Sequence, residues 1–251
     1  MKFTVIRRDS VPSTNDSAKA LARAGAPAGT VVTAAGQACG RGTKGRRWDS
    51  PRGFGLYASV ILKPPADVLA FLPLAAGMAA RSAVKKSAGV DARLRWPNDL
   101  VWEGRKLGGI LCESGFTGEA LDFAVVGIGI NVGQGEGDFP DDLRGRAVSL
   151  GTAAGRPIGV EAVLDALLPA LDAWTARLAA EGGAAIAAAF AARSVPEIGA
   201  DVILDRGDGP FRARYEGIAP DGALMVSTDS GPRRFHSAEI LRFGQGGHFG
   251  L

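Results

Sequence analysis

Nine residues, GRGTKGRRW at positions 40–48, carry three glycines and four basic side chains. Glycine permits positive φ and lets backbone N–H groups approach an anion closely. Arginine adds paired donors that suit a carboxylate or a phosphate. The surrounding segment, residues 36–53, is rich in glycine and has little periodicity, which predicts a long loop. We interpret it as an anion-binding loop; a solvated basic surface and an RGG-like nucleic-acid contact are the alternatives.

Two well-known phosphate motifs do not fit this stretch. A P-loop needs Gly-Lys followed by Ser or Thr, whereas Gly45 is followed by two arginines. Gly40, Gly42 and Gly45 have the spacing of a dinucleotide-binding fingerprint. However, the chain continues as Trp-Asp-Ser-Pro, which does not begin a helix.

Two later segments contain polar residues inside apolar strands. In RWPND, residues 95–99, the proline interrupts a strand and would place Asn98 and Asp99 at a sheet edge. Lys106 opens the apolar run 106–111, where a lysine ordinarily discourages edge aggregation. In VGIGINV, residues 126–132, the alternating glycines predict that another backbone or a ligand packs against one face of the strand.

Outward from these segments, strands and helices alternate irregularly. A turn at residues 12–16 would supply the N-cap of a helix over 17–24, which is a purely structural reason for Ser13 and Thr14. We also predict a flap at 133–146. The expected strands are 3–7, 31–35, 56–62, 93–96, 100–102, 106–114 and 121–131, and the further helices are 69–87, 160–179 and 184–192.

After residue 195 the pattern changes to short strands between Gly, Pro and Asp turns. Five short strands within about fifty residues predict a small barrel of the SH3-like kind. We therefore divide the chain into 1–195 and 196–251. The expected strands of the barrel are 201–204, 211–218, 223–226, 234–237 and 240–243.

The composition is that of a globular protein, with 46% hydrophobic and 22% charged residues among 251. The 29 basic and 26 acidic residues nearly balance, and no aromatic cluster accompanies the basic run, which disfavours a nucleic-acid-binding module. Cys39 and Cys112 make neither a disulfide framework nor a metal site. No secretory signal and no apolar run of about 18 residues is apparent, so we expect a cytoplasmic protein that does not contact membranes.

In combination and order, these motifs resemble the catalytic domain of biotin protein ligases, and the resemblance continues more loosely into a C-terminal barrel. It implies an α+β fold of the class II synthetase/biotin ligase type, a mixed sheet with helices followed by the SH3-like barrel. Related lipoate ligases share the fold but not the GRGxxGRxW and KWPND-like strings. The segments that carry the resemblance are Ser13-Thr14-Asn15, Gln37, 40–48 with Ser50-Pro51, 95–99, 106–111 and 127–131.

Members of this family join biotin to AMP with MgATP, release pyrophosphate, and pass biotin to a lysine of a carrier protein. The expected partner is thus the biotin carboxyl carrier domain of a biotin-dependent carboxylase, with Mg²⁺ required and a homodimer compatible. No helix-turn-helix precedes residues 1–8, so we expect the ligase-only class that does not bind DNA. The alternatives are a lipoate or octanoate ligase of the same fold and a nucleic-acid-binding module.

The resemblance also implies roles for individual residues. Arg41, Lys106 and Asp99 would be catalytic, although Asp99 could equally hold Lys106 or Arg95 in place. The family often has a third arginine where this chain has Thr43, so part of the cationic contact falls to Lys44 or is lost. The biotin-binding residues would be Ser13, Thr14, Asn15, Gln37, Arg41, Gly42, Thr43, Trp48, Lys106 and Gly109, and the nucleotide-binding residues would be Arg41, Arg46, Asn98, Lys106 and Asn131.

Overall fold

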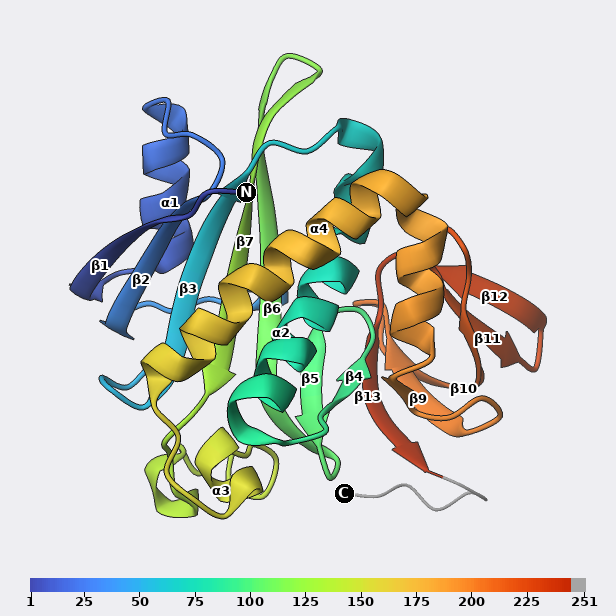
Figure 1. Cartoon of the computed structure of the whole chain (residues 1–251). Coiled ribbons are helices and arrows are strands. Elements are labelled where there is room, and N and C mark those ends of the chain that lie inside the picture. Colours follow the sequence, from blue (N-terminus) through green and yellow to red (C-terminus); the bar gives the residue numbers. More distant parts are fainter. Residues whose placement is uncertain (245–251) are drawn as a thin grey trace.

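A mixed eight-stranded sheet forms the larger part of the structure, a computed structural model that describes residues 1–244 (Figure 1). Its strand order is β1-β2-β3-β7-β6-β5-β4-β8, with β1–β2 and β4–β8 parallel and the other pairs antiparallel. The strands are β1 Thr4–Val11, β2 Thr30–Gln37, β3 Gly55–Leu62, β4 Arg93–Arg95, β5 Asp99–Trp102, β6 Arg105–Thr117, β7 Ala120–Asn131 and β8 Ser194–Val195.

Side chains of a strand alternate between the two faces of a sheet. Consecutive residues of β2 and β3 are mostly apolar and buried, so both faces of the sheet are apolar along these strands. Val31 and Val60 belong to the main core with α2 (Leu72–Ala88) and α4 (Val160–Ala191). Val32 and Ile61 belong to a smaller core with α1 (Thr14–Arg23) on the opposite face. The sheet is therefore covered by two long helices on one side and by α1 on the other (Figure 1).

The apolar segment Ala66–Ala88, which comprises η2 (Ala66–Phe71) and α2, is long enough by length and composition to cross a membrane. It departs from the expectation that no apolar run reaches about 18 residues. In the structure α2 packs against α4 and the sheet. Of the most apolar 18-residue stretch within Ala66–Ala88, 56% is buried. Such burial is typical of the core helix of a folded domain.

A five-stranded antiparallel sheet, ordered β12-β11-β10-β9-β13, follows the large sheet and corresponds to the expected SH3-like barrel. The large sheet ends at Val195, and the small one begins at Asp201; residues 245–251 of the predicted barrel segment lie outside the described part. The indole N–H of Trp96 donates to the carbonyl of Gly222 at 2.9 Å and joins the two sheets. The strands are β9 Asp201–Asp205, β10 Pro210–Ile218, β11 Leu224–Thr228, β12 Gly231–Phe235 and β13 Glu239–Gly244.

Several boundaries differ from the sequence predictions. Helix α1 begins at Thr14 rather than at 17, because the N-cap position falls on Ser13. The two helices expected at 160–179 and 184–192 form one element with a break at Gly182, where φ is 77°. Strand β12 begins earlier, at Gly231, since an edge strand tolerates Pro232. The short elements α3 (Leu150–Ala154) and β8 have too little periodicity to be predicted.

Candidate functional site

A cavity of about 1140 Å³ opens on the α1 side of the large sheet. Its floor is formed by β3, β6 and β7, and its walls by the start of α1, the loop 40–48 and the flap 133–146. Residues 239–243 of β13 close the remaining side. The cavity exceeds the roughly 300–1,000 Å³ of most small-molecule sites, so it has room for two substrates at once. All predicted site residues line it: Ser13, Thr14, Asn15, Gln37, Arg41, Gly42, Thr43, Arg46, Trp48, Asn98, Asp99, Lys106, Gly109 and Asn131.

Short polar side chains gather where α1 begins. Gln37 Oε1 accepts from the backbone N–H of Thr14 at 2.8 Å and from its hydroxyl at 3.1 Å, and Gln37 Nε2 donates to Ser50 Oγ at 2.9 Å. Ser13 occupies the N-cap position, yet its side chain makes no capping hydrogen bond. Ser13 therefore does not cap the helix through its side chain, and its hydroxyl is available to a ligand.

Asn15 is held by protein groups on every side of its amide. Its Nδ2 donates to the carbonyl of Leu111 at 3.2 Å and to Glu113 at 2.7 Å, and its Oδ1 accepts from Ser59 at 2.6 Å. The amide lies over Gly127, where a Cβ would come within 2.2 Å of Oδ1. Both N–H groups of Asn15 are therefore occupied, and Gly127 makes room for this side chain rather than for a backbone or a ligand.

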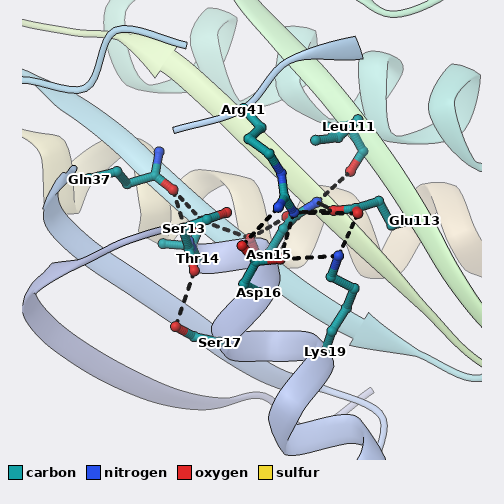
Figure 2. A network of polar contacts seen from close by, with 11 residues as sticks. Ser13, Thr14, Asn15, Asp16, Ser17, Lys19, Gln37, Arg41, Leu111 and Glu113 are labelled. Carbon is teal, nitrogen blue, oxygen red and sulfur yellow. Dashed lines mark hydrogen bonds and ion pairs between the residues drawn. The ribbon is translucent and has the colours of Figure 1, made fainter. Parts of the chain in front are cut away.

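Arg41 points toward α1 and enters a cluster of four charged side chains (Figure 2). It makes a paired contact with Asp16 at 2.8 and 2.6 Å and lies 3.2 Å from Glu113, which also accepts from Lys19 at 2.5 Å. Burial would raise the pKa of Glu113, but its contacts with Lys19, Asn15 and Arg41 outweigh that effect and hold the pKa below its usual range. The hydrogen bond with Asp16 raises the pKa of Arg41.

The second charged group lies at the start of β5 and β6. Lys106 Nζ is 2.6 Å from Asp99, and Arg95 contacts the other oxygen of the same carboxylate at 2.7 Å. Burial would raise the pKa of Asp99, but the charges of Lys106 and Arg95 outweigh it and lower the pKa below its usual range. Asp99 is thus ionised at neutral pH and orients both cations, and two positive groups face the cavity around one negative one.

Trp48 lies flat on the glycines of the sheet. A Cβ at Gly129 would come within 2.7 Å of the indole, and one at Gly109 within 3.3 Å. Lys106 Nζ lies 5.4 Å from the centre of the ring, within the range of a cation–π contact. The indole N–H is buried and has no hydrogen-bond partner among residues 1–244. The alternating glycines of β7 therefore accommodate Asn15 and Trp48.

The basic loop reaches the barrel. Arg46 forms an ion pair with Glu239 of β13 and donates to the hydroxyl of Thr43 at 3.1 Å, while Lys44 lies 4.0 Å from the same glutamate. With Arg41 on Asp16, and Arg47 3.9 Å from Asp49, each basic residue of the loop has an acidic neighbour. This pairing leaves little free positive charge for a nucleic acid.

The side-chain amides of Asn98 and Asn131 donate hydrogen bonds to backbone carbonyls. Asn98 Nδ2 donates to the carbonyl of Ile110 at 2.7 Å. Asn131 Nδ2 donates to the carbonyl of Val148 at 3.2 Å, and Asn131 Oδ1 accepts from Gln134 at 3.5 Å. Asn98 thus ties its loop to β6, and Asn131 connects the end of β7 to the flap through Gln134, in addition to lining the cavity.

Sequence reasoning did not single out several polar residues in or beside the cavity, among them Asp16, Ser59, Glu113 and Glu239. Their patterns gave no signal, because a lone acid on a helix or strand usually faces solvent and a serine within an apolar strand is common. Only tertiary structure shows that Ser59, fully buried, lies beside Thr14 and Asn15.

Comparison with known proteins matches residues 6–131 to the biotin/lipoate A/B protein ligase family and residues 198–242 to the biotin protein ligase C-terminal domain. The chain is 33% identical over 238 residues to the bifunctional ligase/repressor BirA of Bacillus subtilis (strain 168), covering 94% of this chain and 73% of that protein. It is 34% identical over 234 residues to the biotin–[acetyl-CoA-carboxylase] ligase of Paracoccus denitrificans, covering 91% and 96%.

Among solved structures, the biotin protein ligase of Aquifex aeolicus in complex with biotin and ATP superimposes with a TM-score of 0.81. It has 27% sequence identity and covers 94% of this chain and 99% of its own. The family model matches half of the chain, and the similarity to the Paracoccus ligase extends over nearly all of both proteins. On these grounds, the chain belongs to the biotin/lipoate A/B protein ligase family.

Proposed function

We propose that the protein is a biotin–protein ligase, which activates biotin with MgATP to biotinyl-5′-AMP and transfers biotin to a lysine of a biotin carboxyl carrier domain. The observation that carries this proposal is the composition of the cavity. It has uncharged hydrogen-bonding groups at Ser13, Thr14 and Gln37, and cationic groups at Lys106 and Arg95. A ring with N–H donors and a carbonyl fits the first end, and a carboxylate beside phosphates fits the second.

Adenylation brings together two anions, the biotin carboxylate and the triphosphate. A carboxylate oxygen attacks the α-phosphorus, the new P–O bond forms, and the bond to pyrophosphate breaks. Fixed positive charge lowers the energy of this encounter, most of all where water is excluded. Lys106 lies at the cavity wall with its ammonium oriented by Asp99, and the loop 40–48 adds backbone N–H groups. We assign Lys106 to the oxygens that gain charge in this step.

In this scheme the guanidinium of Arg41 contacts Asp16 and Glu113, beside the uncharged end of the cavity that would bind the ring of biotin. Its side chain holds the loop against α1. The backbone N–H of Gly42 donates to the carbonyl of Arg46 at 2.7 Å, so we assign the backbone N–H of Thr43 to the carboxylate. Asn98, Asn131 and Arg46 surround the proposed nucleotide end.

In the transfer step, the lysine amine of the carrier attacks the acyl carbon, AMP leaves, and the amine loses a proton. A lysine of pKa about 10.4 is neutral only about one part in a thousand near pH 7.4. Asp99, with its lowered pKa, is a weak base, so we assign it to orienting Lys106 and the incoming amine rather than to taking the proton.

The test is to incubate the purified protein with biotin and MgATP and to measure pyrophosphate and biotinyl-AMP, with lipoate and octanoate in parallel reactions. Biotin-dependent pyrophosphate release, followed by labelling of an added carrier domain, is the expected result. Pyrophosphate release with lipoate or octanoate but not with biotin would be consistent with the fold and would overturn biotin as the substrate. A folded protein that releases no pyrophosphate with any of these acids would overturn the proposal.

A further inference from the structure

Ser59, at the centre of β3, is a fully buried polar residue with no role in the mechanism above. Register places it opposite Gly127 of β7, on the face of the sheet that carries α1. Its hydroxyl lies 2.8 Å from Thr14 Oγ1 and 2.6 Å from Asn15 Oδ1; its single proton is directed to Asn15 Oδ1, which can only accept, so its oxygen is left to pair with the Thr14 hydroxyl. A single buried hydroxyl thus contacts two neighbouring residues at the uncharged end of the cavity.

The direction of these hydrogen bonds determines what Thr14 offers a ligand. The hydroxyl proton of Thr14 has two acceptors inside the protein, Gln37 Oε1 and Ser59 Oγ, and Gln37 Oε1 also accepts from the Thr14 backbone. A hydroxyl has one proton and two acceptor lone pairs, so a proton directed to either of these groups leaves only lone pairs for the cavity. Toward the cavity, Thr14 therefore retains an acceptor and no donor.

Gln37 complements this acceptor. Its Oε1 accepts from Thr14 and one N–H of its amide donates to Ser50, so the amide orientation is fixed. The other N–H has no hydrogen-bond partner among residues 1–244. The uncharged end thus combines an acceptor at Thr14 with donors at Gln37 and Ser13. A cyclic urea matches this set, whereas a dithiolane ring or an alkyl chain has no group to pair with the Thr14 oxygen.

We propose that Ser59 is a positioning residue for ring recognition: by donating to Asn15 and offering its oxygen to the Thr14 hydroxyl, it keeps the Thr14 proton inside the protein and the Thr14 oxygen as an acceptor for a ligand N–H. The proposal deepens the proposed function and rests on it. No water can replace the hydroxyl, because Ser59 has no exposed surface. Without it, Asn15 Oδ1 loses its donor in a buried place and the Thr14 hydroxyl loses its anchor.

The experiment compares wild type, Ser59→Ala and a matched control, Ser194→Ala. Ser194 is likewise buried and bonds a helix carbonyl, that of Phe190, but does not line the cavity. KM values for biotin and for ATP are measured by pyrophosphate release, and Kd values by calorimetry for biotin and for biotin methylated at either ring nitrogen. Circular dichroism checks folding; if Ser59→Ala does not fold, Ser59→Cys, which keeps the volume with a weak S–H donor, replaces it.

In Ser59→Ala we expect the KM for biotin to rise about tenfold, the loss typical of one unpaired buried partner, with the KM for ATP within about twofold. The preference for biotin over at least one methylated analogue should narrow, and Ser194→Ala should behave as wild type. An unchanged KM for biotin, or equal rises for biotin and ATP, would overturn the role of Ser59. A wild type inactive with biotin would instead refute the proposed function itself.

Discussion

Asp99 illustrates how one partly buried carboxylate can organise two cations. Lys106 contacts one of its oxygens and Arg95 contacts the other, so both cations are held at the cavity wall. The three side chains together keep one net positive charge. Sequence reasoning left open whether Asp99 acts on the acceptor amine or holds its basic neighbours. The geometry adds weight to the second role, because the lowered pKa makes the carboxylate a poor proton acceptor.

Replacing Asp99 with Asn tests this role through stability. Removing the carboxylate leaves Lys106 and Arg95 facing each other, and the free energy of unfolding at pH 7 should fall by about 3 kcal/mol. Because the folded pKa is lowered, the wild-type stabilisation is present above the unfolded pKa of about 4 and is lost as pH falls below it. Urea unfolding at pH 7 and pH 3.5 should show the difference shrinking at the lower pH. A constant difference would contradict the pairing.

Lys106→Met should slow biotin-dependent pyrophosphate release about a hundredfold, the order of loss seen when one preorganised donor to developing charge is removed. The matched control is Lys86→Met, which removes an exposed lysine from the last turn of α2. The two rates are compared at saturating biotin and ATP. A rate within threefold of wild type would exclude Lys106 from the chemical step.

At the scale of elements, the two faces of β7 make different contacts. Ile128 and Ile130 enter the main core, while Gly127 and Gly129 accept Asn15 and Trp48 on the other side. The strand thus anchors the start of α1 and the end of the basic loop with the same two glycines. The polar residues of the cavity depend on this close approach.

Gly127→Ala should therefore disturb the uncharged end of the cavity. The new methyl group would lie 2.2 Å from Asn15 Oδ1, which Ser59 and Glu113 hold in place, so Asn15 must move. We expect the KM for biotin to rise at least about tenfold. Gly137→Ala is the control, since a Cβ there meets nothing within 4 Å and the glycine has an ordinary φ. Equal kinetics for the two variants would contradict the assignment.

Much of the fold could be predicted from local pattern, and the site only in part. The apolar runs of β3 and β7 and the small-residue helix α2 are local signals, so their existence and type were predicted correctly. The SH3-like barrel followed from its turn spacing, although the start of β12 did not. The partners of Arg41 could not be predicted, because Asp16 and Glu113 lie 25 and 72 residues from it in sequence.

At the scale of the molecule, the barrel is part of the cavity wall. Glu239 of β13 pairs with Arg46 in the basic loop, and Trp96 of the larger part donates to Gly222 of the barrel. The first contact is more exposed than the second, which is partly buried, so the second contributes more to stability. The first instead restrains the loop that covers the proposed carboxylate and phosphate groups.

Glu239→Gln should release that restraint with little effect on global stability. Exposed ion pairs contribute up to about 1 kcal/mol, so the melting temperature should change by only a few degrees. Hydrogen exchange of residues 42–47 should become faster, whereas Glu216→Gln, which alters a barrel glutamate bonded to Ser227, should leave it unchanged. Unaltered exchange in Glu239→Gln would show that the loop is held by other contacts.

The span of the cavity wall along the chain has a consequence for protein synthesis. Its first residue is Ser13 and its last is Phe243, so the wall draws on nearly the whole chain. While β13 is still being synthesised, the nascent polypeptide lacks residues 239–243 of the wall and the partner of Arg46. The cavity is therefore completed only when the last described strand of the chain has been made and has docked.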